Sequence, residues 1–208
     1  MRLGYRLAST FLKSLFRLVF GLKIYGAERV PHIGRLLIAC NHISKLDSPI
    51  VGASIPREVV YAAQREIFRG WMGTVIRYFN AIPVTRSGFD RSAINILTDK
   101  LNEDQAVLMF IQGGISRGHE VKKPKPGIGM LALKTNTDIL PMRIVGSDKS
   151  ERGWRETAKL FFHSGAIKIY FGKVISISNF DDLPEDSKES PRRIAEIVMI
   201  EINKLGEG

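Results

Sequence analysis

LLIACNHISKLD (residues 36–47) joins five consecutive apolar residues to a segment that carries a histidine, a serine and an aspartate. An apolar run of this length is typical of a strand that is buried on both faces. His42 follows the expected strand end, and Asp47 is placed to open the next helix. Ligand crevices in open α/β sheets form at such strand ends. This stretch therefore indicates both the fold class and a candidate site.

The rest of the chain repeats this alternation of short apolar runs and helical spacing. Strand-like runs separated by helical patterns predict an α/β fold with a mostly parallel central sheet covered by helices. The expected strands are 36–40, 59–63, 81–84, 106–111, 139–145 and 167–171, and the expected helices are 64–79, 89–102, 127–136 and 190–204.

The composition limits the class of protein. The 208 residues fit one domain or a domain with a small appendage. A single cysteine, Cys40, excludes an internal disulfide framework and a thiolate metal cluster, and it favours a reducing, cytoplasmic setting. His32, His119 and His163 lack a spacing that suggests a metal site. The net charge of +10 favours polyanions, which include nucleic acid, anionic membranes and phosphorylated small molecules.

The N-terminal segment predicts an amphipathic helix. At the helical period one broad side of residues 2–23 is apolar and the other polar. Lys13 and Arg17 interrupt the apolar residues, so a transmembrane helix is not expected. We expect 1–22 to be a membrane-associating interfacial helix on an anionic surface, and 23–208 to form the α/β domain. The alternative is a helix packed on the protein's own core. The apolar side holds Leu7, Ala8, Phe11, Leu12, Leu15, Phe16, Leu18, Val19 and Leu22, and the polar side holds Arg2, Arg6, Ser9, Thr10, Lys13 and Arg17.

His42 and Asp47 have the chemistry of a base and its orienting carboxylate. If Asp47 hydrogen-bonds one ring nitrogen of His42, the other nitrogen is free to accept a proton. Ser44 is better placed to cap the following helix or to bond the turn than to act as a nucleophile. The nucleophile would then be a substrate hydroxyl, deprotonated by His42 as it attacks an acyl donor. The alternative is a histidine satisfied by a loop carboxylate.

Two further segments follow expected strands. In the first, IPVTR (82–86), Arg86 follows the end of the expected strand. The alternative is an ordinary surface arginine. The second, FIQGGISRG (110–118), contains Gly113 and Gly114. Adjacent glycines let backbone N–H groups approach an anion or oxyanion closely, although a tight turn is the simpler interpretation. Lys122 and its neighbouring lysines add a positive rim.

These blocks occur in the order N-H-x-S-x-x-D, I-P-V-x-R, F-x-x-G-x-x-S, and a proline before a final strand at 140–143. Together they resemble the glycerolipid acyltransferase family, typified by bacterial 1-acylglycerol-3-phosphate acyltransferases. The resemblance covers roughly residues 22–175. The N-terminal helix resembles the membrane-anchoring helical region of the family.

The resemblance implies acyl transfer from a thioester of acyl carrier protein or coenzyme A to the free hydroxyl of a lysophospholipid. The acceptor that it favours is 1-acyl-sn-glycerol 3-phosphate, which would give phosphatidic acid. His42 would be the general base and Asp47 its orienting partner, while Arg86 would help to hold the acceptor's phosphate. No metal and no bound cofactor are expected, and the protein would be a peripheral membrane protein on the cytoplasmic face. The other expected substrate-binding residues are Asn41, Gln112, Gly113, Gly114, Ser116, Arg117 and Lys122.

The third block departs from the family pattern F-P-E-G-T-R-S. Gln112 replaces the glutamate and Ile115 the arginine, which removes a carboxylate charge and a bidentate phosphate fork. Arg117 or Lys122 could substitute for the arginine. Asn80 stands where a glycine is frequent. These departures favour two alternatives, an acceptor with another head group or a non-catalytic lipid-binding protein with a degraded site. Nucleic-acid binding is not expected, because aromatic residues do not interleave with the cations.

Overall fold

The computed structural model describes residues 1–84, 91–116, 123–151, 166–184 and 189–207, and its centre is one seven-stranded sheet. The spatial order of the strands is β1-β7-β6-β2-β5-β3-β4, and every pairing is parallel except that of β6 with β7. The predicted α/β class with a mostly parallel sheet is confirmed. The strands are β1 Lys23–Tyr25, β2 Leu36–Cys40, β3 Val59–Gln64, β4 Ala81–Val84, β5 Ala106–Phe110, β6 Ile139–Val145 and β7 Lys168–Phe171.

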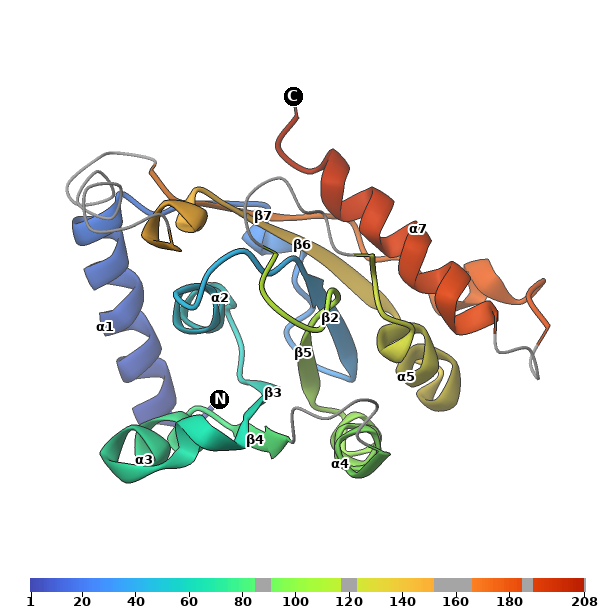
Figure 1. Cartoon of the computed structure of the whole chain (residues 1–208), viewed down its shortest axis with the longest axis horizontal. Helices are drawn as coiled ribbons and strands as arrows, with labels where there is room; N and C mark the ends of the chain where they lie inside the picture. The colour runs from blue at the N-terminus through green and yellow to red at the C-terminus, as the bar shows by residue number, and fades with distance from the viewer. Residues whose placement is uncertain (85–90, 117–122, 152–165, 185–188, 208) are drawn as a thin grey trace.

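Helices cover both faces of this sheet, with α1 and α2 on one side and α4, α5 and α7 on the other (Figure 1). The side chains of β2 show why the strand is apolar throughout. Leu36 and Ile38 pack in the cluster that contains α2, and Leu37 packs in the cluster that contains α4, α5 and α7. The helices are α1 Leu3–Phe20, α2 Asp47–Ser54, α3 Gly70–Tyr78, α4 Arg91–Asn102, α5 Gly127–Thr135 and α7 Ser190–Lys204.

Two parts of the fold differ from the sequence prediction. The helix expected over 64–79 is wrong in its first part, since β3 runs to Gln64, a 3-10 helix occupies Arg65–Phe68, and α3 begins only at Gly70. Gly70 has φ 63°, a conformation that interrupts a helix and that glycine adopts without strain. The short edge strand β1 was not predicted. It is too short for a period-2 pattern, and it forms because its backbone pairs in parallel with β7.

Helix α1 packs against the domain by a face that only partly matches the apolar side of the helical wheel. Tyr5, Ser9 and Phe20 are buried, and Phe16 and Val19 pack against the core. Ser9, which the helical wheel placed on the polar side, is therefore buried rather than exposed. The alternative prediction, a helix packed on the protein's own core, holds for part of α1. Other residues of the apolar side remain exposed. Leu7, Phe11 and Leu18, together with the neighbouring Leu3, are 61–70% accessible.

The N-terminal end of α1 is tied to the domain through Arg2. Its guanidinium forms an ion pair with Glu58 at 3.1 Å and donates to the side-chain oxygen of Asn80 at 2.7 Å. Asn80 in turn donates to Glu58 at 3.2 Å. Asn80 has φ 61°, in the left-handed region that Asn tolerates better than most residues. The substitution of the family's frequent glycine thus keeps the turn and adds a link to α1.

Candidate active site

The candidate site lies at the carboxyl ends of three neighbouring parallel strands, β6, β2 and β5. His42 follows β2, Gln112 and Ser116 follow β5, and Ser147 follows β6. Parallel strands with the order β6-β2-β5 bring these three loops to one edge of the sheet. This is the position at which open α/β sheets form ligand crevices.

The hydrogen bond predicted between His42 and Asp47 is present. Nδ1 of His42 lies 2.9 Å from Oδ2 of Asp47, and the Asp47 side chain is fully buried while that of His42 is 15% exposed. The same carboxylate oxygen accepts the backbone N–H groups of Ile43 at 2.7 Å and Ser44 at 2.8 Å. With Nδ1 engaged, Nε2 is the ring nitrogen available to a substrate. The arrangement suits a base held in one orientation.

Ser147 is a member of this network that the sequence analysis missed. Its hydroxyl donates to Oδ1 of Asp47 at 2.5 Å, across 100 residues of sequence, and its side chain is fully buried. Gly146, with φ 92°, turns the chain at the end of β6. Glycine is required at this position, because a Cβ there would lie 2.0 Å from the carbonyl oxygen of Ala166. The only sequence signal was a Gly-Ser pair after a predicted strand, which is too common to single out.

The loop after β5 holds the backbone of His42 from both sides. The side-chain oxygen of Gln112 accepts the His42 N–H at 2.8 Å, and the N–H of Ser116 donates to the His42 carbonyl at 2.8 Å. The ring of Phe110 stacks on the imidazole with centroids 4.0 Å apart. A glutamine provides the acceptor oxygen that this geometry requires. The departure from glutamate at this position therefore leaves the backbone contact intact.

The hydroxyl of Ser116 is a buried polar atom beside His42. The residue is 8% exposed, and within the described part of the chain its Oγ has no hydrogen-bond partner. An unsatisfied buried hydroxyl is costly unless a ligand or water completes it. Ser116 is thus placed to bond a substrate group that approaches His42.

Gly113 and Asn41 have mainly structural contacts. Gly113, with φ 65°, donates its N–H to the Phe110 carbonyl at 3.0 Å, so that N–H closes a tight turn. Asn41 donates to the carbonyl of Ile144 at 2.9 Å and accepts its N–H at 2.8 Å. The Asn41 side chain thereby continues the ladder between β2 and β6. Gly114 lies next to Gly113 in the same turn.

Ser44 behaves as the sequence suggested, and Cys40 is a buried thiol next to the site. The Ser44 hydroxyl accepts the Leu46 N–H at 3.0 Å and so bonds the turn. Cys40 is fully buried, and burial raises the pKa of its thiol well above the usual value. A buried neutral thiol is a poor nucleophile. Among the residues that the structure describes, no group of three or more histidine, cysteine, aspartate or glutamate side chains could hold a metal ion.

Three of the expected phosphate-binding residues are Arg86, Arg117 and Lys122. All three lie outside the described residues. Lys125, at the end of the same loop, packs its side-chain carbons over Gly113, where a Cβ would lie 3.2 Å away. The positive rim is therefore described only at Lys123 and Lys125.

Comparison with known proteins shows the family. The model of a family described as Acyltransferase matches residues 21–145. The chain is 27% identical to a 1-acyl-sn-glycerol-3-phosphate acyltransferase of Bacillus subtilis (strain 168) over 203 residues, which cover 97% of this chain and 96% of that protein. It is 24% identical to the protein of the same name from Borreliella burgdorferi over 191 residues, covering 89% and 74% of the two chains.

A solved structure has the same fold. The crystal structure of the 1-acyl-sn-glycerophosphate acyltransferase PlsC from Thermotoga maritima superposes with a TM-score of 0.74 at 22% identity, covering 96% of this chain and 77% of that one. The chain belongs to the acyltransferase family. Within it, the chain is similar to O-acyltransferases named for 1-acyl-sn-glycerol 3-phosphate.

Proposed function

We propose that the protein transfers a fatty acyl group from an acyl thioester to the free hydroxyl of 1-acyl-sn-glycerol 3-phosphate, giving phosphatidic acid. The His42–Asp47 pair at 2.9 Å, with the remaining ring nitrogen available, carries this proposal. The name shared by the two bacterial relatives supports this acceptor. The thioester would be that of acyl carrier protein or coenzyme A, and no further cofactor is needed for the step.

The reaction balances with groups that the site contains. His42 takes the proton of the acceptor hydroxyl at Nε2 while the oxygen attacks the thioester carbonyl. Asp47 holds the imidazole and stabilises the imidazolium that forms. Collapse of the tetrahedral intermediate forms the ester, breaks the carbon–sulfur bond and releases the thiolate, which recovers the proton from His42. Ser116, with its unsatisfied hydroxyl, can donate a hydrogen bond to an oxygen of the reacting groups.

An acyl-transfer assay with lysophosphatidic acid and larger-headed lysolipids tests the proposal. We expect His42→Ala to lower kcat by about 10²–10⁴-fold, the range of a general base. Product formation from lysophosphatidic acid that does not depend on His42 would contradict the mechanism. Faster turnover of a larger-headed lysolipid would instead favour another acceptor, and no product with any acceptor would favour a lipid-binding protein.

We propose further that α1 places the protein on the cytoplasmic face of an anionic membrane. In the described part of the chain no helix is long and apolar enough to cross a bilayer. The exposed stripe of Leu7, Phe11 and Leu18 recurs at spacings of four and seven residues, so these side chains share one face. Arg6 and Arg17 are exposed beside it. Each such cation is worth about 1 kcal/mol near an anionic surface.

Liposome sedimentation tests whether this stripe of α1 binds the membrane. Leu7→Ser, Phe11→Ser and Leu18→Ser together should abolish binding to anionic vesicles without lowering the melting temperature, because these side chains contact solvent. A matched control, Ile33→Ser with Ile200→Ser, removes exposed apolar residues that are 86% and 54% accessible but lie outside α1. Equal binding by the triple variant and the control would rule out membrane contact by this stripe.

A further inference from the structure

A groove of about 410 Å³ lies beside the catalytic edge, on the outer part of the sheet. Val145 of β6 and Lys168 and Tyr170 of β7 line it from the sheet. Lys149, in the 3-10 helix Ser147–Glu151, and Glu207, which follows α7, line it from the sides. Its volume falls within the range of small-molecule sites. The mechanism above uses none of the residues that line it.

Some of the charged side chains in the groove have hydrogen-bond or ion-pair partners, and others have none among the described residues. Arg143 donates to the carbonyl of Leu205 at 2.7 Å and pairs with Glu207 at 3.3 Å, so it fastens the C-terminal tail. Asp148 also has an interaction of its own. By contrast, Lys149 and Lys168 have no ion pair within the described part of the chain. Two cations of the groove therefore remain available to an anion.

Strand register connects this groove to the catalytic histidine. Lys168 pairs with Val145 on β6 and with Lys23 on β1. Asn41, the residue before His42, bonds the backbone of Ile144 on β6. The backbone of Lys168 is therefore about two strand spacings, roughly 10 Å, from the backbone of His42 along the sheet edge. Lys149 follows by two residues the Ser147 that bonds Asp47.

The groove lies on the opposite face of the sheet from α1. Ile144 and Ile169 point into the core cluster shared with α1 and α2. Because side chains alternate along a strand, the intervening Val145 and Lys168 point to the other face. A lipid acceptor arriving along the apolar stripe of α1 would leave this groove free.

We propose that Lys149 and Lys168 bind the phosphate of the acyl donor's phosphopantetheine arm, with the thioester extended along the end of β6 to His42. The inference rests on the thioester-dependent transfer proposed above. Acyl carrier protein and coenzyme A donors both contain this phosphate. A pantetheine arm has the length of about four extended residues, roughly 14 Å, which exceeds this backbone separation and leaves length to pass over the end of β6 from one face of the sheet to the other. Lysine is a common phosphate ligand as a point charge.

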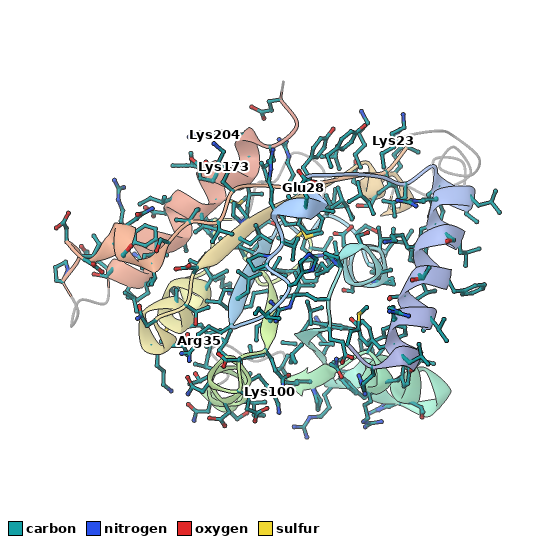
Figure 2. The ribbon with its side chains drawn as sticks, turned by 180° about the vertical axis from the view of Figure 1, so that it is seen from behind. Lys23, Glu28, Arg35, Lys100, Lys173 and Lys204 are labelled. Carbon is teal, nitrogen blue, oxygen red and sulfur yellow. The ribbon has the colours of Figure 1, made fainter. Side chains whose placement is uncertain are left out.

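Donor kinetics test the site. The variant is Lys149→Gln with Lys168→Gln, and the control is Lys100→Gln with Lys134→Gln. The control removes the same charge, and Figure 2 places Lys100 on α4, away from Lys23 and Lys204. Each is assayed with acyl-CoA, acyl carrier protein thioester and S-acyl-pantetheine, which lacks the phosphate. We expect the variant to raise KM for the phosphorylated donor by about tenfold or more. The kcat, the KM for the lysolipid and turnover of S-acyl-pantetheine should match the control.

Several outcomes would overturn the assignment. An unchanged KM for both phosphorylated donors, or an equal loss with S-acyl-pantetheine, would exclude phosphate binding in the groove. A raised KM for the lysolipid would assign the lysines to the acceptor. Titration of free phosphopantetheine into the wild type and the variant separates this inference from the proposed function. Binding that the variant loses supports the groove even without turnover, and equal or absent binding in both contradicts it.

Discussion

Ser147 donates a 2.5 Å hydrogen bond to Oδ1 of Asp47, and the opposite oxygen of that carboxylate holds Nδ1 of His42 at 2.9 Å. Both oxygens of the carboxylate are therefore held by hydrogen bonds, one from the segment that follows β6 and one from the loop that follows β2. These hydrogen bonds restrict rotation of the carboxylate, and the hydrogen bond to Asp47 in turn restricts the orientation of the His42 ring. Ser147 is a positioning residue, since it acts on the reaction through Asp47.

Ser147→Ala should lower kcat by about ten- to a hundredfold, because it removes a hydrogen bond to a charged group. KM for the lysolipid should stay near that of the wild type, since the side chain of Ser147 is fully buried. Ser147→Thr, which keeps the hydroxyl, should recover most of the lost rate. Steady-state kinetics on both variants measure this. Parallel loss in the Ala and Thr variants would indicate a packing role instead.

Gln112→Glu should leave kcat within about threefold of the wild type, because the oxygen that accepts the His42 N–H remains. Gln112→Met keeps the size but deletes the acceptor. It should cost about 1–3 kcal/mol of unfolding free energy by leaving the partly buried N–H of His42 unpaired. Denaturant unfolding and the acyl-transfer assay separate the two effects. A tenfold gain in the Glu variant would show instead that the carboxylate charge matters.

Cys40 should resist thiol-specific reagents in the folded protein and react readily in denaturant. Its side chain is fully buried, and desolvation, followed by the nearby charge of Asp47, raises the pKa of the thiol well above its usual value. The reactive thiolate is therefore scarce at neutral and mildly alkaline pH. Labelling followed by mass spectrometry measures this. Rapid labelling of the native protein, with loss of activity, would reopen a catalytic role for Cys40.

Gly129→Ala should destabilise the protein by about 1–3 kcal/mol through overpacking. A Cβ at this position of α5 would lie 2.2 Å from the backbone oxygen of Pro191 at the start of α7. Gly52 in α2 provides the control, since a Cβ there would meet nothing within 4 Å. Gly52→Ala should stabilise by about 0.5–1 kcal/mol through helix propensity. Thermal unfolding of both variants tests the contrast, and equal melting temperatures would contradict it.

Local pattern was enough to predict much of the fold. The apolar run at 36–40 is a buried central strand, because a strand covered on both faces buries the side chains of every position. Other runs of the same kind located β3 to β7, and the five-residue interval between His42 and Asp47 allowed their hydrogen bond. The amphipathic pattern of α1 was also visible. The periodicity of α1 could not predict which of its apolar residues face the protein. Phe16 and Leu18 are both large apolar residues on the same side of the helical wheel, but only Phe16 packs on the core.

The amino-acid sequence by itself determined the α/β alternation and the His42–Asp47 pair, since both depend on neighbours within about one turn or one strand. Tertiary structure alone decided that Ser147 meets Asp47 across 100 residues. It also decided that β1 joins the sheet and that Lys149 and Lys168 share a groove. These contacts depend on which strands become neighbours and in what register. That choice is made by burial of the whole sheet between its helices, which no short stretch of sequence encodes.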